Sequence, residues 1–191
     1  MIDLTPFVFV ILMIPCLFIL YNCSKKKYSN LEKFMIVSFY IYLIFLFSKT
    51  FLPLPINELD KIIFKNMAIK NNYIPFKSII EIITTSTNNV IIYQIGGNIL
   101  LTIPLGFFLP IIYKNINLAK AMKIGLAVAV GIEIMQGVVS KIIGIQYRSI
   151  DVDDILLNII GTIIGYLIYK IFNKIIYNKV SNRITPVQSK E

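Results

Sequence analysis

Long apolar stretches, each close to the length needed to cross a bilayer, constrain this chain more than any other feature. A helix needs about 20 mostly apolar residues to span the hydrocarbon core. Such stretches occur at residues 4–21, 31–52, 90–113, 119–139 and 154–176, and 57% of the chain is hydrophobic. Within lipid, backbone polar groups must be satisfied inside the segment. The sequence therefore predicts an all-α membrane protein, a polytopic helical bundle with about five transmembrane helices.

The segment between the second and third stretches differs in character. Residues 59–67 place apolar side chains at helical spacing with lysines elsewhere, which is typical of a helix lying on a membrane surface. Residues 77–85 are expected to form another short interfacial helix. The chain is then a single membrane domain over residues 1–191. Two N-terminal helices occupy residues 1–53, a core occupies 70–177, and a flexible cytoplasmic tail occupies 178–191.

The net charge of +9 arises in a chain that has no histidine. This removes the commonest zinc ligand and the commonest general base. Membrane proteins place Lys and Arg on their cytoplasmic side, so the charge is explained without nucleic acid as a partner. With five spans, basic residues are most frequent on the cytoplasmic side if the N-terminus lies outside, and the run Lys25, Lys26 and Lys27 is the strongest signal. The prediction is an external N-terminus and a cytoplasmic C-terminus.

Polar and ionisable side chains gather where the last two apolar stretches meet. Glu133 and Gln136 share one stripe near the end of the fourth stretch, and Asp151, Asp154 and Asn158 share one face of the fifth. The loop between them is short, so the two helices should be antiparallel neighbours. Ionisable groups within or beside a bilayer are costly, and they mark functional sites by default.

Two further polar residues complete the candidate site, and two glycines lie below it. Arg148 lies in the loop and Asn98 in the third stretch, while Gly161 and Gly165 would let another helix approach the fifth closely. Asp153 is expected to point elsewhere. The polar side chains should converge in one pocket opening to the outer leaflet. The candidate catalytic residues are Glu133, Arg148, Asp151 and Asp154, and the candidate substrate-binding residues are Asn98, Gln136, Arg148 and Asn158.

Helix capping is the structural alternative for part of this set. Acidic residues at a helix start satisfy free backbone amides and suit the helix dipole. Asp151 taken alone fits such a cap better than a catalytic role, Arg148 would then neutralise a carboxylate, and Gln136 and Asn158 would join helices. The whole set fits a functional site better, because Glu133 lies too far inside its helix to be a cap.

The residue types narrow the chemistry without fixing it. Oxygen ligands without His or thiolate suit a divalent cation such as Mg²⁺ or Ca²⁺, although the metal stays unknown. Arg148 at the rim suits a phosphate group, and a buried Glu133 suits an acid or a base. The sequence contains no recognisable nucleophilic arrangement of Ser, Cys or His. Both a reaction and simple binding therefore remain open.

Several motifs between residues 70 and 170 have a specific combined spacing. They are Asn72-x-Ile-Pro-Phe, Gly97-Asn98 with Pro104-Leu-Gly106-Phe and Pro110, Glu133-x-x-Gln136, and Arg148-x-x-Asp151-x-x-Asp154-x-x-x-Asn158-x-x-Gly161-x-x-x-Gly165. Together they resemble the VanZ-like family, whose founding member is associated with resistance to the glycopeptide antibiotic teicoplanin. The resemblance implies a multi-pass protein of a bacterial cell membrane, of the Gram-positive type, that affects the cell envelope. It does not extend to the first two stretches.

Two classes of function fit this resemblance. In one, an intramembrane enzyme or lipid-handling protein acts on a lipid-linked or phosphorylated envelope precursor, or on a glycopeptide-related ligand. In the other, a non-catalytic membrane module alters the envelope or the access of the antibiotic to its target. The lipid bilayer is the expected partner in both.

Overall fold

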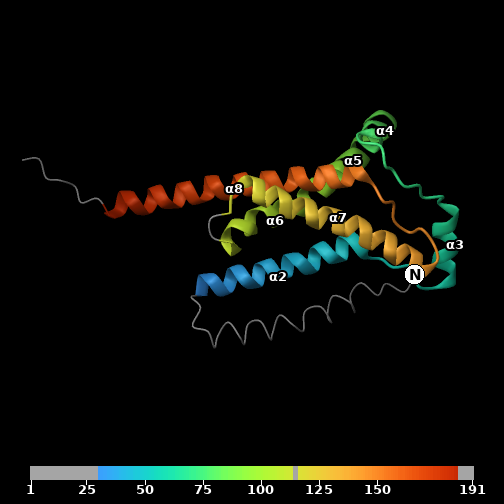
Figure 1. Cartoon of the computed structure of the whole chain (residues 1–191), viewed down its shortest axis with the longest axis horizontal. Coiled ribbons are helices and arrows are strands. Elements are labelled where there is room, and N and C mark those ends of the chain that lie inside the picture. Colours follow the sequence, from blue (N-terminus) through green and yellow to red (C-terminus); the bar gives the residue numbers. More distant parts are fainter. Residues whose placement is uncertain (1–29, 114–115, 185–191) are drawn as a thin grey trace, which may run out of the picture.

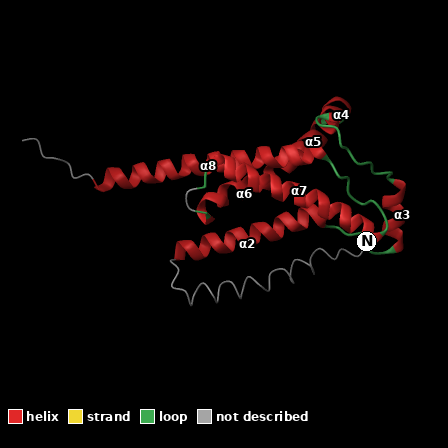
Figure 2. Ribbon diagram, viewed as in Figure 1, coloured by secondary structure: helices red, strands yellow, loops and turns green. Residues whose placement is uncertain are grey.

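The secondary structure is helical, which confirms the predicted all-α fold (Figure 2). The computed structural model describes residues 30–113 and 116–184, with side chains described as far as Ile175. The expected span at residues 4–21 and the last part of the expected tail, residues 185–191, lie outside the described residues. The elements are α2 (Asn30–Phe51), α3 (Glu58–Asn66), α4 (Lys77–Thr85), α5 (Asn88–Ile91), the π-helix η1 (Ile92–Gly96), α6 (Gly97–Ile112), α7 (Leu118–Ile143) and α8 (Val152–Ile184).

Four helical segments are long and apolar enough to cross a membrane. They are Asn30–Phe51, Asn88–Ile112, Leu118–Ile143 and Val152–Ile175, and each begins within two residues of a predicted stretch. The protein is therefore a polytopic helical membrane protein. One boundary differs from the prediction, because α8 continues to Ile184 and residues 178–184 are helical rather than part of a tail. Adding a residue to an existing helix costs little once the helix is nucleated, so the polar residues of this segment do not end it.

Small residues allow α6 and α8 to approach very closely. A Cβ atom added to Gly161 would lie 2.1 Å from the backbone oxygen of Ile99, and one added to Gly165 would lie 1.9 Å from that of Ile103. Gly106 has the same role on α6, since a Cβ atom added to it would lie 1.9 Å from the backbone oxygen of Thr162 on α8. The glycines thus permit backbone-to-backbone contact, as the sequence predicts for Gly161 and Gly165.

One apolar core joins the four spans into a bundle (Figure 1). Its buried members come from α2, α6, α7 and α8, and they are Tyr42, Leu46, Leu105, Leu109, Ala121, Ile132 and Tyr166. Large apolar side chains also remain exposed on the outer faces of the spans, including Phe45, Leu100, Leu126 and Ile171. An apolar outer face suits a helix surrounded by lipid rather than water.

The two short helices, α3 and α4, lie at the same end of the bundle (Figure 1). Asn57 begins α3, because its side chain accepts a hydrogen bond of 2.8 Å from the Asp60 amide. Leu59, Ile62 and Ile63 of α3 are exposed, as expected for a helix that rests on a membrane surface. The existence of both short helices is confirmed, and the bounds of α4 coincide with the predicted residues 77–85.

The distribution of basic residues predicts which side of the membrane the end with α3 and α4 faces. With the N-terminus outside, Asn88 at the start of α5 faces the exterior and Ser29 faces the cytoplasm. Single cysteines at these two positions, in a chain lacking Cys16 and Cys23, should be distinguished by a membrane-impermeant maleimide added to intact cells. We expect labelling at position 88 and none at 29 until the cells are opened. The reverse pattern would invert the topology.

Candidate functional site

A polar cavity of about 200 Å³ lies among the four spans, near the end of the bundle that carries α3 and α4. The last turn of α2, the first turn of α6, the C-terminal half of α7, the start of α8 and the loop before α8 all contribute to its wall. Its lining residues are Lys49, Thr50, Asn98, Leu101, Ile132, Glu133, Gln136, Arg148, Ser149, Asp154 and Asn158. The structure thus brings together Asn98, Glu133, Gln136, Arg148, Asp154 and Asn158, while their functional roles stay predictions.

Two carboxylates face this polar cavity, and each accepts a hydrogen bond from a neighbouring element. Glu133 is only 3% exposed, and its Oε2 accepts a bond of 2.8 Å from the backbone amide of Asp151. Asp154 Oδ1 accepts a bond of 2.5 Å from the Asn98 side-chain amide. A buried carboxylate needs such donors to offset the loss of water. The bonds also fix where the carboxylates point.

Two cations line the same polar cavity, one more than the sequence analysis assigned to the site. Arg148 donates a bond of 2.9 Å from Nη2 to the backbone oxygen of Leu52, just after α2. Lys49, in the last turn of α2, also lines the polar cavity, and its Nζ lies 5.7 Å from the centroid of the Phe45 ring. An ion pair joins Lys61 to Glu58. Among the described residues, neither Lys49 nor Arg148 lies within 4 Å of a carboxylate oxygen. Arg148 therefore forms no direct ion pair in the described part of the chain, and its neutralisation of a carboxylate stays a prediction.

The side-chain amides divide between joining helices and facing the polar cavity. Gln136 Nε2 donates a bond of 2.9 Å to the Thr50 backbone oxygen, which ties α7 to α2. Asn158 is 3% exposed, and its Oδ1 is buried without a hydrogen-bond partner in the structure. Buried polar atoms are almost always satisfied, so an exception calls for a bound water or ligand group. Asn158 is the amide best placed to meet one.

Asp151 departs from the predicted set, because its carboxylate faces away from the polar cavity. Oδ1 accepts bonds of 2.8 Å from Asn72 Nδ2 and of 2.8 Å from the Asp153 amide, and Oδ2 accepts one of 2.5 Å from Ser78 Oγ. The bond from the Asp153 amide caps the start of α8. The cap interpretation of Asp151 therefore describes its geometry, and only its backbone amide, bonded to Glu133, reaches the site.

Asp153 points elsewhere, as expected, and it has a structural task. Only 1% exposed, it accepts bonds of 2.5 Å from the Phe76 amide and 3.2 Å from the Ile79 amide. These amides stand at the start of α4, so one carboxylate of α8 holds the N-terminal end of another helix. Sequence reasoning missed this link. The Asn72-x-Ile-Pro-Phe motif could have indicated this link, because its last residue, Phe76, directly precedes α4.

The chain around residue 72 also fixes the loop before α8. The Asn72 amide donates to the Ile150 oxygen at 2.9 Å, and the Val152 amide donates to the Asn72 oxygen at 3.0 Å. Asn71 Oδ1 accepts from the Ile150 amide at 2.9 Å and from the side-chain amide of Gln146. The loop that carries Arg148 is therefore held along most of its length.

Tyr147 anchors the same loop on its buried side. It is 2% exposed, and its hydroxyl donates a bond of 3.4 Å to the Phe51 oxygen. Burial raises the pKa of this phenol above its ordinary value, while the nearby Arg148 guanidinium acts in the opposite direction. The hydroxyl therefore stays protonated at neutral pH and remains a donor to α2.

Metal binding was left open by the sequence. Among the described residues, no group of three or more His, Cys, Asp or Glu side chains could hold a metal ion. The polar cavity offers two carboxylates, with amide oxygens as further hard ligands. A role for Mg²⁺ or Ca²⁺ stays a prediction.

The sequence of the chain matches a known protein family. The family model described as VanZ/LLP1 matches residues 39–173, well over half of the chain. The chain belongs to the VanZ/LLP1 family. The match confirms the resemblance over residues 70–170 and extends it into α2, which supplies Lys49 and Thr50 to the polar cavity. No curated protein and no solved structure matches the chain.

Proposed function

We propose that this VanZ/LLP1 membrane protein binds a phosphorylated or lipid-linked component of the bacterial cell envelope in its polar cavity. The observation that carries the proposal is the combination of Lys49 and Arg148 with two carboxylates and three amides in one cavity near the ends of four spans. Cations suit a phosphate, and Arg presents a planar fork to its oxygens. Carboxylates and amides suit the hydroxyl and amide groups of an envelope precursor.

The family resemblance connects this binding to resistance against teicoplanin-type glycopeptides. By the basic-residue bias, the polar cavity lies on the outer side of the membrane, where these antibiotics meet their target. A protein that binds or alters an envelope component there changes what the antibiotic can reach. Resistance is accordingly proposed as the consequence of the binding and not as a separate activity.

A non-catalytic role is the second candidate, and one observation favours it. Glu133 and Asp154 each already accept a hydrogen bond of 2.8 Å or less from the protein, so both carboxylates are held in place without a ligand. Groups held in this way serve to position a ligand or to stabilise the polar cavity. Under this alternative, an uncharged amide at either position is tolerated.

Charge-removing variants of the two carboxylates separate these candidates. We expect Glu133→Gln and Asp154→Asn to return the teicoplanin inhibitory concentration of a susceptible Gram-positive host to that of cells without the protein. Loss of one charged hydrogen bond weakens binding by about tenfold. The measurement is the inhibitory concentration for teicoplanin, set beside the membrane level of a tagged protein.

Glu81→Gln is the matched control, because Glu81 is an exposed carboxylate of α4 outside the polar cavity. Arg148→Lys adds a second comparison, since it keeps the positive charge but removes the planar fork. Full resistance in all four variants at wild-type protein level would contradict the proposal. Resistance retained by Glu133→Gln and Asp154→Asn but lost by Arg148→Lys would favour the non-catalytic alternative.

A further inference from the structure

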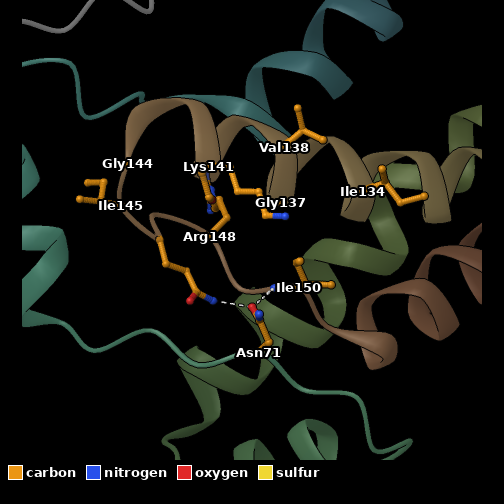
Figure 3. A pocket seen from close by; sticks show the side chains of 11 residues that line it. Asn71, Ile134, Gly137, Val138, Lys141, Gly144, Ile145, Arg148 and Ile150 are labelled. Carbon is orange, nitrogen blue, oxygen red and sulfur yellow. Dashed lines mark hydrogen bonds between the residues drawn. The ribbon is translucent and has the colours of Figure 1, made fainter.

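A second and larger hollow, of about 690 Å³, runs along the C-terminal half of α7 next to the polar cavity. We call it the α7 groove. Figure 3 shows its lining side chains, which belong to α7, to the loop that follows it and to Asn71. The lining residues are Asn71, Ile134, Gly137, Val138, Ser140, Lys141, Gly144, Ile145, Gln146, Arg148 and Ile150. The proposed function does not use this space.

The wall of the α7 groove is a firmly held loop. Gly144 ends α7 in the left-handed conformation, with φ of 81°, and turns the chain back. The returning loop then packs against the helix, since a Cβ atom added to Gly137 would lie 2.8 Å from Ile150 Cδ1. Asn71 and its neighbours hold this loop by the hydrogen bonds described above. The hollow is thus built into the fold.

The α7 groove opens within the membrane at one end and is polar at the other. Ile134 and Val138 belong to the candidate span Leu118–Ile143 and are 59% and 41% exposed, so lipid chains are the medium around them. Lys141 in the last turn of α7 and Arg148 in the loop lie at the other end, between α7 and the loop in Figure 3. The α7 groove is therefore apolar at one end and cationic at the other, which matches the apolar chain and the anionic head group of a lipid.

Two features connect the α7 groove to a ligand rather than to bulk lipid. Arg148 lines both the α7 groove and the polar cavity, so a ligand in either space would lie against the same residue. Ser140 Oγ, on the wall of the α7 groove, is buried and has no hydrogen-bond partner in the structure. Such a hydroxyl is uncommon, and it can donate to a ligand oxygen once the wall of the α7 groove shifts to expose it.

We infer that the α7 groove holds the hydrocarbon chain of a membrane lipid whose phosphate contacts Arg148 and Lys141. The inference rests on the proposed function and sharpens it. The component bound is a phosphate-bearing lipid, its chain lies along Ile134 and Val138, and the remainder of its head group enters the polar cavity.

Photo-crosslinking of the purified full chain in phosphatidylcholine nanodiscs tests this inference. The probe is a long single-chain alkyl monophosphate with a diazirine near the end of the chain, and the comparison probe is the same chain ending in an uncharged alcohol. We expect the phosphate probe to label residues 134–150 in preference to the other outward faces of the spans. The alcohol probe should label this segment much less. Labelling spread evenly over α2, α6 and α8, or equal labelling by the two probes, would overturn the inference.

Variants that fill the hollow sharpen the test. Val138→Trp should lower labelling of residues 134–150 by about tenfold, the effect expected when about two methylene groups lose their contact. Leu126→Trp is the matched control, because Leu126 lies on the same helix, is 44% exposed and does not line the α7 groove. Ile134→Trp repeats the test if Val138→Trp elutes as an aggregate. Equal labelling of a monodisperse filling variant and Leu126→Trp would overturn the inference.

The two proposals fail separately in these experiments. Loss of groove labelling in the filling variants is read without any antibiotic, so it does not depend on resistance. Conversely, full resistance in Glu133→Gln, Asp154→Asn and Arg148→Lys would remove the proposed function, while labelling of the α7 groove in the unchanged protein is measured independently.

Discussion

Replacing Asp153 by alanine is expected to detach α4 from the start of α8 and to destabilise residues 72–85 by about 3 kcal/mol, the value for two hydrogen bonds to a charged acceptor. The Asp153 carboxylate is 1% exposed and accepts from the amides of Phe76 and Ile79. Phe76 has a φ of 66°, in the left-handed region that costs a non-glycine residue about 1–2 kcal/mol. Without Asp153, the Phe76 amide loses its acceptor, and only the longer bond of 3.3 Å from the Lys77 amide to the Ile74 oxygen still closes this turn.

Hydrogen exchange in detergent or nanodiscs measures this result directly. In the Asp153→Ala variant, the amides of Phe76 and Ile79 should exchange at least about a hundredfold faster than in the unchanged protein, as a loss of about 3 kcal/mol requires. Glu81→Ala, which removes an exposed carboxylate from the same helix, should leave their exchange unchanged. Unaltered protection of Ile79 in Asp153→Ala would show that other contacts of α4 hold it in place.

The effect should extend from α4 to the polar cavity through Asp151. Ser78 of α4 donates to the Asp151 carboxylate, and the Asp151 amide donates to Glu133. A displaced α4 removes the first of these bonds and frees the residue that orients Glu133. We therefore place Asp153, Ser78 and Asp151 among the residues that position the site, while Glu133 lines it.

Much of the fold follows from the apolar stretches, because in lipid the helix is nearly the only way to satisfy the backbone. The grouping of Glu133, Gln136, Asp154 and Asn158 also follows from the sequence, since helical periodicity and a short loop suffice to predict it. Lys49 could not be assigned to the site in this way. It is the last basic residue of α2, and it lines the polar cavity only because α2 packs beside α7.

Two further features depend on contacts between residues distant in sequence. Asp153 bonds to amides more than 70 residues earlier in the chain, which no local pattern encodes. The π-helix at Ile92–Gly96 lies directly before α6, whose second residue is Asn98, and changes the register of the third span by its wider turn. The sequence indicates a distortion there through Gly96 and Gly97, but not its kind.

Gly161→Ala is expected to disrupt the contact between α6 and α8 and, with it, the polar cavity. The added Cβ would lie 2.1 Å from the Ile99 oxygen and 2.3 Å from Thr102 Oγ1, so the helices must separate. Overpacking of this kind typically costs about 1–3 kcal/mol, and a clash with backbone belongs at the upper end. Because Asn98 precedes Ile99 on α6, separation should also draw its amide away from Asp154.

A glycine on α7 provides the control, and a double-mutant cycle tests the mechanism. In the described part of the chain, a Cβ added to Gly131 would meet nothing within 4 Å beyond its own stretch of helix, so Gly131→Ala should be neutral or should stabilise its helix by up to about 1 kcal/mol. If Gly161→Ala already breaks the bond between Asn98 and Asp154, adding Asn98→Ala should cause little further loss of thermal stability in detergent. Fully additive losses would mean that the clash is absorbed without moving Asn98. In that case the glycines would serve the packing of the bundle alone, and the bond between Asn98 and Asp154 would not depend on Gly161.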